Sequence, residues 1–301
     1  MSVLLPEEIP AKSILQRAAP KNYGWFGIDY NMNLYKGCCH GCIYCDSRSS
    51  CYRIEDFDQV RRKAEALKIL EMELKSKRKK GVIGIGAMSD TYNPFEKECC
   101  LTMGALKLIR DYGFGVSLDT KSSLAVRDQE LFARIGREQP VIVKFTITAA
   151  DDATAAEIEP GVCVSSSRFA AMEQLSRAGI FTGVLMTPLL PFLTDTPENV
   201  KNIVRLAAEH QARFVYGMFD VTLRENQREY YFRQLDRLHP GLSHRYRQIY
   251  ADQYLCESQN SKTLARIFTQ ECEKYGLLYR MKDIIEAYRN IPSYDQMKLM
   301  F

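Results

Sequence analysis

The sequence predicts an α/β protein built around a parallel sheet, in the form of an open, partial barrel of six β/α units. Between residues 81 and 218, short apolar runs of strand length alternate with longer amphipathic stretches. This alternation is typical of parallel strands that are joined by crossover helices and buried on both faces. The runs that we assign to buried strands are residues 82–88, 114–118, 141–146, 180–186 and 214–218.

Hydrophobic spacing and helix caps supply the other elements of the six units. We expect a first strand near residues 32–35 and a helix over residues 58–74, whose apolar residues recur three and four positions apart. A later helix begins with Thr196 as its N-cap and Pro197 at its first position, a common pair at helix starts. The apolar stripe of this helix is Val200, Ile203, Val204 and Ala207, and that of the helix before it is Phe169, Met172 and Leu175.

Six units are too few to close an eight-stranded barrel, so the predicted barrel stays open along one side. In parallel α/β folds the functional residues gather at the carboxyl ends of the strands. Four segments follow predicted strands and should therefore meet on one rim. They are the cysteine-rich loop at residues 38–45 and the pairs at residues 89–90, 120–121 and 187–188.

The pattern changes after Phe219 to charged, aromatic-rich stretches without a further strand signal. Residues 226–238, 243–250 and 261–275 have the spacing of helices. We therefore divide the chain into an N-terminal segment (1–24), the partial barrel (25–220) and a helical C-terminal extension (221–301).

Composition restricts the class of protein. The 301 residues are 46% hydrophobic, enough for a sizeable core, and carry a formal net charge of +4 with a pI near 8.4. This mild basicity allows an anionic partner without requiring one. Ten cysteines without a disulfide-type pattern fit a reducing compartment. Since residues 1–16 lack the apolar core of a signal peptide and no apolar run is long enough for a membrane span, we expect a cytoplasmic protein.

Three thiols stand out on the loop after the first predicted strand, at the spacing Cys38-x3-Cys42-x2-Cys45. Thiolates from one loop can hold three irons of a cubane [4Fe–4S] cluster, and the fourth iron is then left without a protein ligand. A substrate or cofactor can bind to a metal centre at such an open position. The loop therefore predicts a reactive cluster.

Cys39 allows a second arrangement, because Cys39, Cys42 and Cys45 also begin the spacing of bacterial ferredoxins. That spacing continues with a cysteine and a proline, where this chain has two serines. A zinc ribbon needs a second Cys-x2-Cys pair, which the adjacent Cys99-Cys100 pair does not provide. We prefer a metal or cluster site, with a group of inert buried cysteines as the alternative.

The cysteine spacing, with the aromatic Tyr44 before the last cysteine, resembles the signature of the radical S-adenosylmethionine (SAM) superfamily. Further segments are similar to the branch of spore photoproduct lyase-like, or DNA repair photolyase-like, proteins. The resemblance extends over most of the chain, in AKSIL at 11–15, NLYKGC at 33–38, SDTYNP at 89–94, TKS at 120–122, GVLMTP at 183–188 and TLRENQREY at 222–230.

The resemblance implies cofactors and a mechanism. Cys38, Cys42 and Cys45 would hold a [4Fe–4S] cluster, and SAM would chelate the remaining iron through its amino and carboxylate groups. One electron from a reductant such as a flavodoxin or ferredoxin would cleave SAM into methionine and a 5′-deoxyadenosyl radical. That radical would abstract a hydrogen atom from the substrate, while the protein orients the cofactor.

The resemblance also suggests which rim residues contact SAM. Tyr44 would stack on the adenine, with support of the loop as the alternative. The Ser89-Asp90 pair would hold the amino group, unless it only forms a turn. Lys121 would pair with the carboxylate, although an exposed lysine has the same sequence signature. Thr146 is a weaker candidate of this kind, and the backbone at Leu185-Met186 would meet the adenine.

Two positions depart from spore photoproduct lyase. That lyase has a hydrogen-donating cysteine at the end of its second strand and a tyrosine directly after the last cluster cysteine, and this chain has Ala87 and Asp46 there. These departures argue against thymine-dimer lyase activity. Cys99, Cys100 or Cys163 could replace the missing donor if the fold brings one near.

The leading hypothesis is a radical SAM enzyme that acts on a nucleic acid, in repair or modification. The alternatives are a radical SAM enzyme that acts on a peptide or small metabolite and, more remotely, a non-enzymatic iron–sulfur or zinc protein. Arginines and tyrosines near the C-terminus resemble a nucleic-acid surface in composition, and the packing of amphipathic helices explains them equally well. They are Arg224, Arg228, Tyr230, Tyr231, Arg245, Tyr246 and Arg247.

Overall fold

The computed structural model describes residues 5–19 and 24–290. Its main sheet has seven strands in the spatial order β10-β9-β8-β7-β6-β3-β2. Every neighbouring pair from β3 to β10 is parallel, whereas β2 (Leu15–Arg17) runs antiparallel to β3 at one edge. The six parallel strands confirm the predicted partial barrel. They are β3 (Tyr30–Met32), β6 (Val82–Ile85), β7 (Gly115–Thr120), β8 (Val141–Thr146), β9 (Phe181–Met186) and β10 (Phe214–Gly217).

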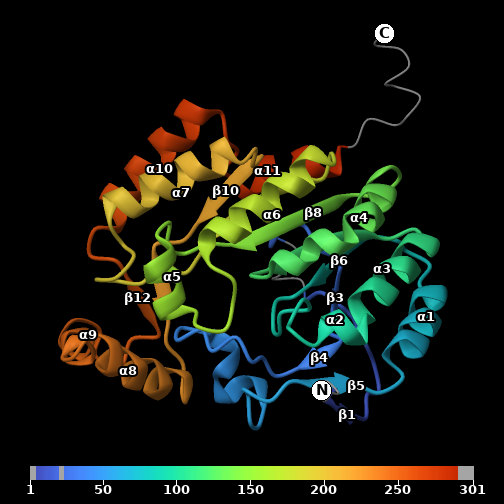
Figure 1. Cartoon of the computed structure of the whole chain (residues 1–301), viewed down its shortest axis with the longest axis horizontal. Coiled ribbons are helices and arrows are strands. Elements are labelled where there is room, and N and C mark those ends of the chain that lie inside the picture. Colours follow the sequence, from blue (N-terminus) through green and yellow to red (C-terminus); the bar gives the residue numbers. More distant parts are fainter. Residues whose placement is uncertain (1–4, 20–23, 291–301) are drawn as a thin grey trace.

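Helices cover the outer face of this sheet (Figure 1). They pack on a large hydrophobic cluster, to which the strands contribute outward side chains such as Val143, Phe145 and Val184. The short helices α2 (Glu96–Cys99) and α5 (Asp152–Ile158) precede longer ones in the chain. The longer barrel helices are α1 (Ala66–Ser76), α3 (Leu101–Asp111), α4 (Gln129–Gly136), α6 (Ser165–Arg177) and α7 (Pro197–Glu209).

Helix α7 begins as its sequence predicts. Thr196 Oγ1 accepts a hydrogen bond from Asn199 N (3.1 Å), and Pro197 occupies the first turn. Such an N-cap stabilises a helix by about 1 kcal/mol. The predicted apolar stripe is completely buried, in Val200, Ile203, Val204 and Ala207.

Aromatic side chains close the barrel lumen at the amino ends of the strands. Phe26 and Phe214 are both 0% exposed, with ring centres 5.8 Å apart. Together with Ile28 and Ile142 they form a cluster that is separate from the outer one, and helix α11 (Met281–Arg289) covers it. The lumen is therefore plugged at the end opposite the predicted rim.

A second, three-stranded sheet supports the cysteine loop. Its order is β1 (Glu7–Ile9), β5 (Arg61–Lys63) and β4 (Tyr35–Lys36). The prediction of a helix over residues 58–74 is wrong in its first half, since residues 61–63 form β5 and the helix begins at Ala66. Pairing of β5 with β1 and β4 overrides the local amphipathic spacing there. The predicted first strand likewise divides, because β3 ends at Met32 and β4 starts at Tyr35.

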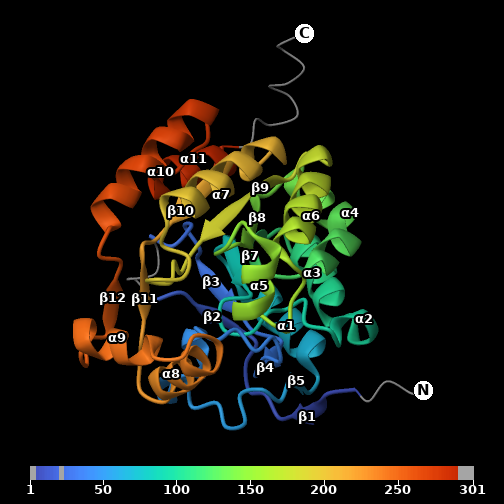
Figure 2. The same cartoon turned by 60° about the vertical axis from the view of Figure 1, so that its left-hand side comes forward.

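The C-terminal part contains the predicted helices and two strands that we did not expect. Helices α8 (Gln227–Leu238), α9 (Leu242–Tyr250) and α10 (Ser261–Tyr275) confirm the helical pattern. The absence of strands was wrongly predicted, since β11 (Asp220–Thr222) pairs antiparallel with β12 (Leu255–Glu257). Three residues are too short to produce a periodic signal. Figure 2 shows α8 and α9 apart from the row of barrel helices, and α10 alongside α7.

The division near residues 24 and 220 stays a prediction, and residues 1–4 and 20–23 of the expected N-terminal segment lie outside the described residues. Within residues 5–19 and 24–290, none of the helices has the length and apolar character that crossing a membrane requires.

Candidate active site

The cysteine loop leaves β4 at Gly37. The φ angle of this residue is +80°, and a Cβ there would lie 2.2 Å from the carbonyl oxygen of Gln59, so the turn requires glycine. The next residue, Cys38, donates its N–H to the carbonyl of Phe57 (2.8 Å). The first thiol of the loop is therefore fixed to the segment that leads into β5.

The last residue of helix α5 and the segment that follows it hold the loop from the other side. The Ile43 N–H donates to the Ile158 carbonyl (3.0 Å), and the Gly161 N–H donates to the His40 carbonyl (2.8 Å). A Cβ on Gly161 would lie 2.6 Å from that His40 oxygen, so the two backbones are in close contact. Two segments distant in sequence thus clamp the cysteines.

Cys38, Cys42 and Cys45 line one cavity of about 80 Å³. Cys39 does not line this cavity and packs against the outer hydrophobic cluster instead. Burial raises the pKa of the Cys39 thiol to about 11, so it stays protonated at neutral pH. The structure thus brings together the three cysteines of the first predicted arrangement and separates Cys39 from them.

The donor set of this cavity fits an iron–sulfur cluster, because thiolates are the usual ligands of such clusters. Among the described residues, no group of three or more His, Cys, Asp or Glu side chains is close enough to hold a single metal ion. A cubane cluster needs a wider arrangement of ligands, since each of its irons takes its own thiolate. Three thiols spread around one cavity fit this arrangement.

His40 connects the first thiol to Asp90. Nδ1 of the buried His40 lies 3.8 Å from Asp90 Oδ2. Burial opposes ionisation of Cys38, but the hydrogen bond and charge of His40 outweigh burial and lower the pKa of the thiol. His40 therefore favours the thiolate, the form of cysteine that binds metals.

Lys121, at the end of β7, has its Nζ 5.6 Å from the centre of the Tyr44 ring and lines the same cavity. Burial raises the pKa of Cys42 and Cys45, and the charge of Lys121 opposes that rise. In return, negative charge on these thiols raises the pKa of Lys121, although burial acts against its charge. A charged Lys121 beside the thiols is well placed for an anionic cofactor group. Its pairing with the SAM carboxylate stays a prediction.

Ser89 and Asp90 line the cavity, and both side chains also have partners within the protein. The Ser89 hydroxyl donates to the Gly37 carbonyl (2.6 Å). The Asp90 carboxylate accepts hydrogen bonds from Tyr92 N (2.9 Å), Thr120 Oγ1 (2.8 Å) and Lys121 N (2.7 Å). The pair thus joins the ends of β6 and β7 to the cysteine loop, and its contact with the SAM amino group stays a prediction.

Tyr44 anchors the loop from behind. Its side chain is 6% exposed and does not line the cavity. The hydroxyl donates to Glu159, which forms a 2.6 Å ion pair with Arg168. This arrangement favours the alternative role of Tyr44, support of the loop, and stacking on adenine stays a prediction.

Thr146 and Met186 end neighbouring strands but face different surroundings. Thr146 lines the cysteine cavity, and its carbonyl accepts a hydrogen bond from Arg168 Nη1 (2.9 Å). Met186 belongs to the outer hydrophobic cluster, whereas Leu185 belongs to the cluster inside the barrel. The Met186 side chain therefore does not reach the cavity, and the expected contact through its backbone stays a prediction.

A larger cavity, of about 470 Å³, occupies the barrel lumen and shares Ala87 and Asp119 with the cysteine cavity. Lys144 lines its wall with only 1% of its side chain exposed. Its Nζ lies 2.8 Å from Asp119 Oδ1 and also donates to Ser117. Burial lowers the pKa of Lys144 in spite of this partner.

Sequence reasoning missed these lumen residues. The signal was present, because Lys144 is the one charged residue of this strand, and a charge in a strand buried on both faces needs a partner. Ser117 and Asp119 stand two positions apart on β7, so they point to the same face of the sheet.

A third cavity, of about 260 Å³, lies on the other side of His40 and Lys121, which line both it and the cysteine cavity. Cys163 also lines it, and the Cys163 thiol donates to the Lys121 carbonyl (3.2 Å). Cys99 and Cys100 line none of the three cavities. Of the candidate hydrogen donors, Cys163 is thus the one beside the site.

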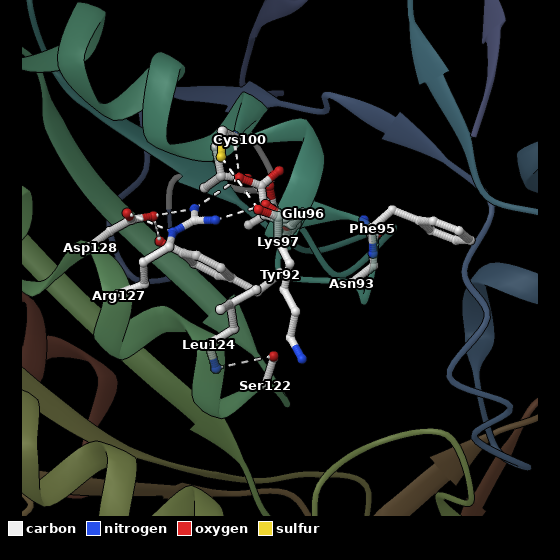
Figure 3. A network of polar contacts seen from close by, with 12 residues as sticks. Tyr92, Asn93, Phe95, Glu96, Lys97, Cys100, Ser122, Leu124, Arg127 and Asp128 are labelled. Atoms are coloured by element: carbon white, nitrogen blue, oxygen red, sulfur yellow. Dashed lines mark hydrogen bonds and ion pairs between the residues drawn. The ribbon is translucent and has the colours of Figure 1, made fainter. Parts of the chain in front are cut away.

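A buried polar network stiffens the wall of this third cavity (Figure 3). The Arg127 guanidinium contacts the carboxylates of Glu96 (2.9 Å) and Asp128 (2.7 Å). The Tyr92 hydroxyl donates to Asp128 as well (2.8 Å), and Tyr92 lines the cavity. The loop after β6 is therefore tied to the turn after β7.

The arginines near the C-terminus are largely engaged within the protein. Arg224 Nε lies 2.9 Å from Asp46 Oδ1, and Arg228 donates to the carbonyls of Ala251, Asp252 and Gln253. Arg245 and Arg247 stack over aromatic rings, at 4.1 and 4.8 Å from the ring centres. These contacts support the packing explanation of the arginine and tyrosine pattern.

Comparison with sequences supports the interpretation of the cysteine loop. A sequence model of the radical SAM superfamily matches residues 32–207. An uncharacterized protein of Mycobacterium tuberculosis is 29% identical over 250 residues, which are 81% of this chain and 73% of that protein. An uncharacterized protein of Methanocaldococcus jannaschii is 33% identical over 171 residues, 56% of this chain and 63% of that protein.

Solved structures share the fold at low sequence identity. Spore photoproduct lyase complexed with dinucleoside spore photoproduct superposes with a TM-score of 0.65 at 13% identity, over 89% of this chain and 79% of that chain. The radical SAM methyltransferase TsrM from Kitasatospora setae, with tryptophan and a SAM analog bound, superposes with a TM-score of 0.52 at 12% identity, over 87% of this chain and 55% of that chain. With the family model covering more than half of its length, the chain belongs to the radical SAM superfamily.

Proposed function

We propose that this protein is a radical SAM enzyme that binds a [4Fe–4S] cluster through Cys38, Cys42 and Cys45. The observation that carries the proposal is that these three thiols line one cavity, which adjoins the larger lumen cavity through Ala87 and Asp119. When bound, the cluster and SAM would supply a 5′-deoxyadenosyl radical for hydrogen abstraction. The adjoining lumen offers space for the substrate beside that chemistry.

The residues of the chain have distinct tasks in this proposal. His40 lowers the pKa of Cys38, and Lys121 adds positive charge beside Cys42 and Cys45. Lys121 and Thr146 stand on the cavity wall where polar groups of SAM could be held. The aromatic cluster around Phe26 fills the far end of the lumen with apolar side chains.

Formation of 5′-deoxyadenosine tests the chemistry. The protein, reconstituted anaerobically with iron and sulfide, should absorb near about 400 nm and release 5′-deoxyadenosine from SAM when dithionite is added. Cys42→Ala should lose both signals. Full cluster content without any cleavage of SAM would instead indicate an electron carrier, and the enzymatic proposal would fail.

We propose a nucleic acid as the substrate, in repair or modification. The support is the shared fold with a lyase whose structure contains a dinucleoside photoproduct, together with the similarity of several segments to that branch. We do not propose that the enzyme splits thymine dimers. That reaction would require a donor thiol where this chain has Ala87, which lines both cavities. A small flavin or iron–sulfur carrier, such as a flavodoxin or ferredoxin, is the proposed reductant, and the cytoplasm the proposed location.

A peptide or small metabolite is the second candidate substrate. It is favoured by the internal contacts of Arg224 and Arg228, which leave fewer free cations for a phosphate backbone. The two candidates differ in salt dependence, since each phosphate contact makes the affinity for single-stranded DNA fall with added salt by a logarithmic slope of about 0.7. Binding of single-stranded DNA with such a slope would support a nucleic-acid substrate. No binding at low salt would favour the peptide or metabolite.

A further inference from the structure

We infer that the lumen cavity takes one unpaired nucleobase of the substrate, whose ring N–H or amino group donates a hydrogen bond to Asp119. The inference rests on the radical SAM function proposed above and names the chemical group that the substrate presents to the site. The inference follows from the polar residues that line the cavity, from the charge of Asp119 among them and from two aromatic rings that line the same cavity.

Strand register arranges the polar wall in two rows. Asn31, Gly84 and Ser117 are Cα partners across β3, β6 and β7, and Asp119 and Lys144 are partners in the next row toward the rim. Gly84 places no side chain between Asn31 and Ser117, and the Ile28 side chain packs over it, since a Cβ there would lie 3.0 Å from Ile28 Cδ1 and 3.3 Å from Asn31 Oδ1. The wall therefore carries an amide and a hydroxyl in one row, with the Asp119 carboxylate in the next.

Asp119 provides a hydrogen-bond acceptor on this wall. Lys144 is committed to the protein, since its ammonium contacts Asp119 Oδ1, Ser117 Oγ and the ring of Phe26, whose centre is 4.4 Å away. Asp119 keeps 16% of its side chain exposed. Its second oxygen has no hydrogen bond within the described residues, so it can accept one from a ligand.

The charge of Asp119 selects the ligand chemistry. A buried ion pair seldom stabilises a fold more than apolar residues of the same size would, so the place of this pair on a cavity wall makes it a candidate for ligand recognition. A carboxylate repels a phosphate or carboxylate and attracts an N–H donor. Asn31 and Ser117, which line the same cavity, can donate to the carbonyl or ring nitrogen that accompanies an N–H on a base edge.

Two aromatic rings line the same cavity. Trp25 and Tyr216 line the cavity in a T-shaped pair, with ring centres 5.6 Å apart. Such rings are the usual stacking platforms for single bases. A cavity of about 470 Å³ suits a nucleoside-sized ligand and is too small for a duplex, so the base must be single-stranded or flipped out.

The position of Trp25 allows a direct test, because it is the single tryptophan of the chain. The cluster-loaded protein, saturated with SAM, is titrated with the deoxydinucleotides TT, CC, AA and GG while its tryptophan fluorescence is recorded. We expect at least one dinucleotide to change the fluorescence saturably. The same dinucleotide methylated at its N–H or amino nitrogens should bind at least about 10-fold more weakly, because the Asp119 carboxylate then loses its donor.

Two variants complete the test. Asp119→Asn should weaken the binding of the preferred dinucleotide by at least about 5-fold. It should also abolish the difference in affinity between this dinucleotide and its methylated form. Asp111→Asn, at the exposed end of α3, should leave both affinities unchanged. The methylated ligand needs no change in the protein, so the test stands even if Asp119→Asn folds poorly.

Other outcomes overturn the inference. If no dinucleotide changes the fluorescence while the same sample forms 5′-deoxyadenosine, the base site is wrong and the radical SAM function stands. If SAM alone saturates the signal and dinucleotides compete with SAM, the cavity holds the adenine of the cofactor instead. If the sample forms no 5′-deoxyadenosine, the proposed function itself fails.

Discussion

Arg168 Nη2 lies 2.6 Å from Glu159 Oε2, and both side chains are completely buried behind the cysteine loop. Glu159 accepts the Tyr44 hydroxyl, and Arg168 donates to the carbonyls of Thr146 (2.9 Å) and Cys163 (2.8 Å). One buried ion pair thus connects the cysteine loop, the end of β8 and the start of α6. Loss of this ion pair should therefore perturb all three segments.

Arg168→Leu should lower the free energy of unfolding by about 3–5 kcal/mol, because it leaves the Glu159 carboxylate buried without its partner. Urea denaturation of the full-length variant measures this change. Arg177→Leu is the matched control, since Arg177 pairs with Glu173 while 67% exposed, and its loss should cost less than about 1 kcal/mol. Equal losses of unfolding free energy in the two variants would show that the buried pair stabilises the fold no more than an exposed pair does.

The two predicted thiol arrangements differ in one residue, so Cys39→Ala and Cys42→Ala form a decisive comparison. Cys39→Ala should retain nearly all of the iron and sulfide after anaerobic reconstitution, because Cys39 lies outside the cavity. Cys42→Ala should lose most of both, because a ligand is missing. Iron analysis and absorbance provide the measurement. Loss of iron in Cys39→Ala at unchanged thermal stability would point to the ferredoxin-like spacing.

Asp90 accepts a hydrogen bond from Tyr92 N in its own turn and others from Thr120 Oγ1 and Lys121 N at the end of β7, so Asp90→Ala should destabilise the fold itself. We expect a loss of about 3 kcal/mol, since buried donors that lose a charged acceptor remain unsatisfied. The exposed Asp252 is the control, and Asp252→Ala should change stability by less than about 0.5 kcal/mol. If Asp90→Ala keeps its melting temperature and only SAM binding weakens, then the cofactor contact is its main role.

Cys272 should make the fold sensitive to alkaline pH. Burial raises the pKa of this thiol in α10 from 9.0 to about 12, so the folded chain keeps the proton that the unfolded chain releases. The contribution to stability is complete below pH 9 and is lost as the pH rises toward 12. At pH 10 the loss amounts to about 1.4 kcal/mol.

The comparison of wild type with Cys272→Ala isolates this effect. Between about pH 8 and pH 10, the stability difference between the two proteins should shrink by about 1.4 kcal/mol. Urea denaturation at both pH values gives the difference. A constant difference would mean that Cys272 ionises as readily in the folded chain as in the unfolded one.

The barrel was predictable from sequence because its signal is local. Each apolar run is long enough to identify a buried strand, and Thr196 with Pro197 marks a helix start without reference to the rest of the chain. The strand β5 was not predictable, because Arg61–Lys63 becomes a strand only through pairing with β1 and β4. Strands β11 and β12 are too short to leave a periodic pattern.

The candidate site divides in the same way. The three cysteines were recognisable from spacing alone, since all of them lie on one loop. The partnership of Lys144 with Asp119 depends on the register of β7 and β8, which no local pattern contains. For Tyr44, the sequence left stacking and support open, and its contact with Glu159, 115 residues later, favours support.

The small sheet that carries the cysteine loop has a consequence for the order of events during synthesis. Its strands β1, β4 and β5 all lie within the first 63 residues, so they can pair before the barrel exists. Glu159 and Arg168, which hold the loop from behind, leave the ribosome about 100 residues later. The part of the chain that presents the three thiols is therefore synthesised well before the residues that form their buried backing.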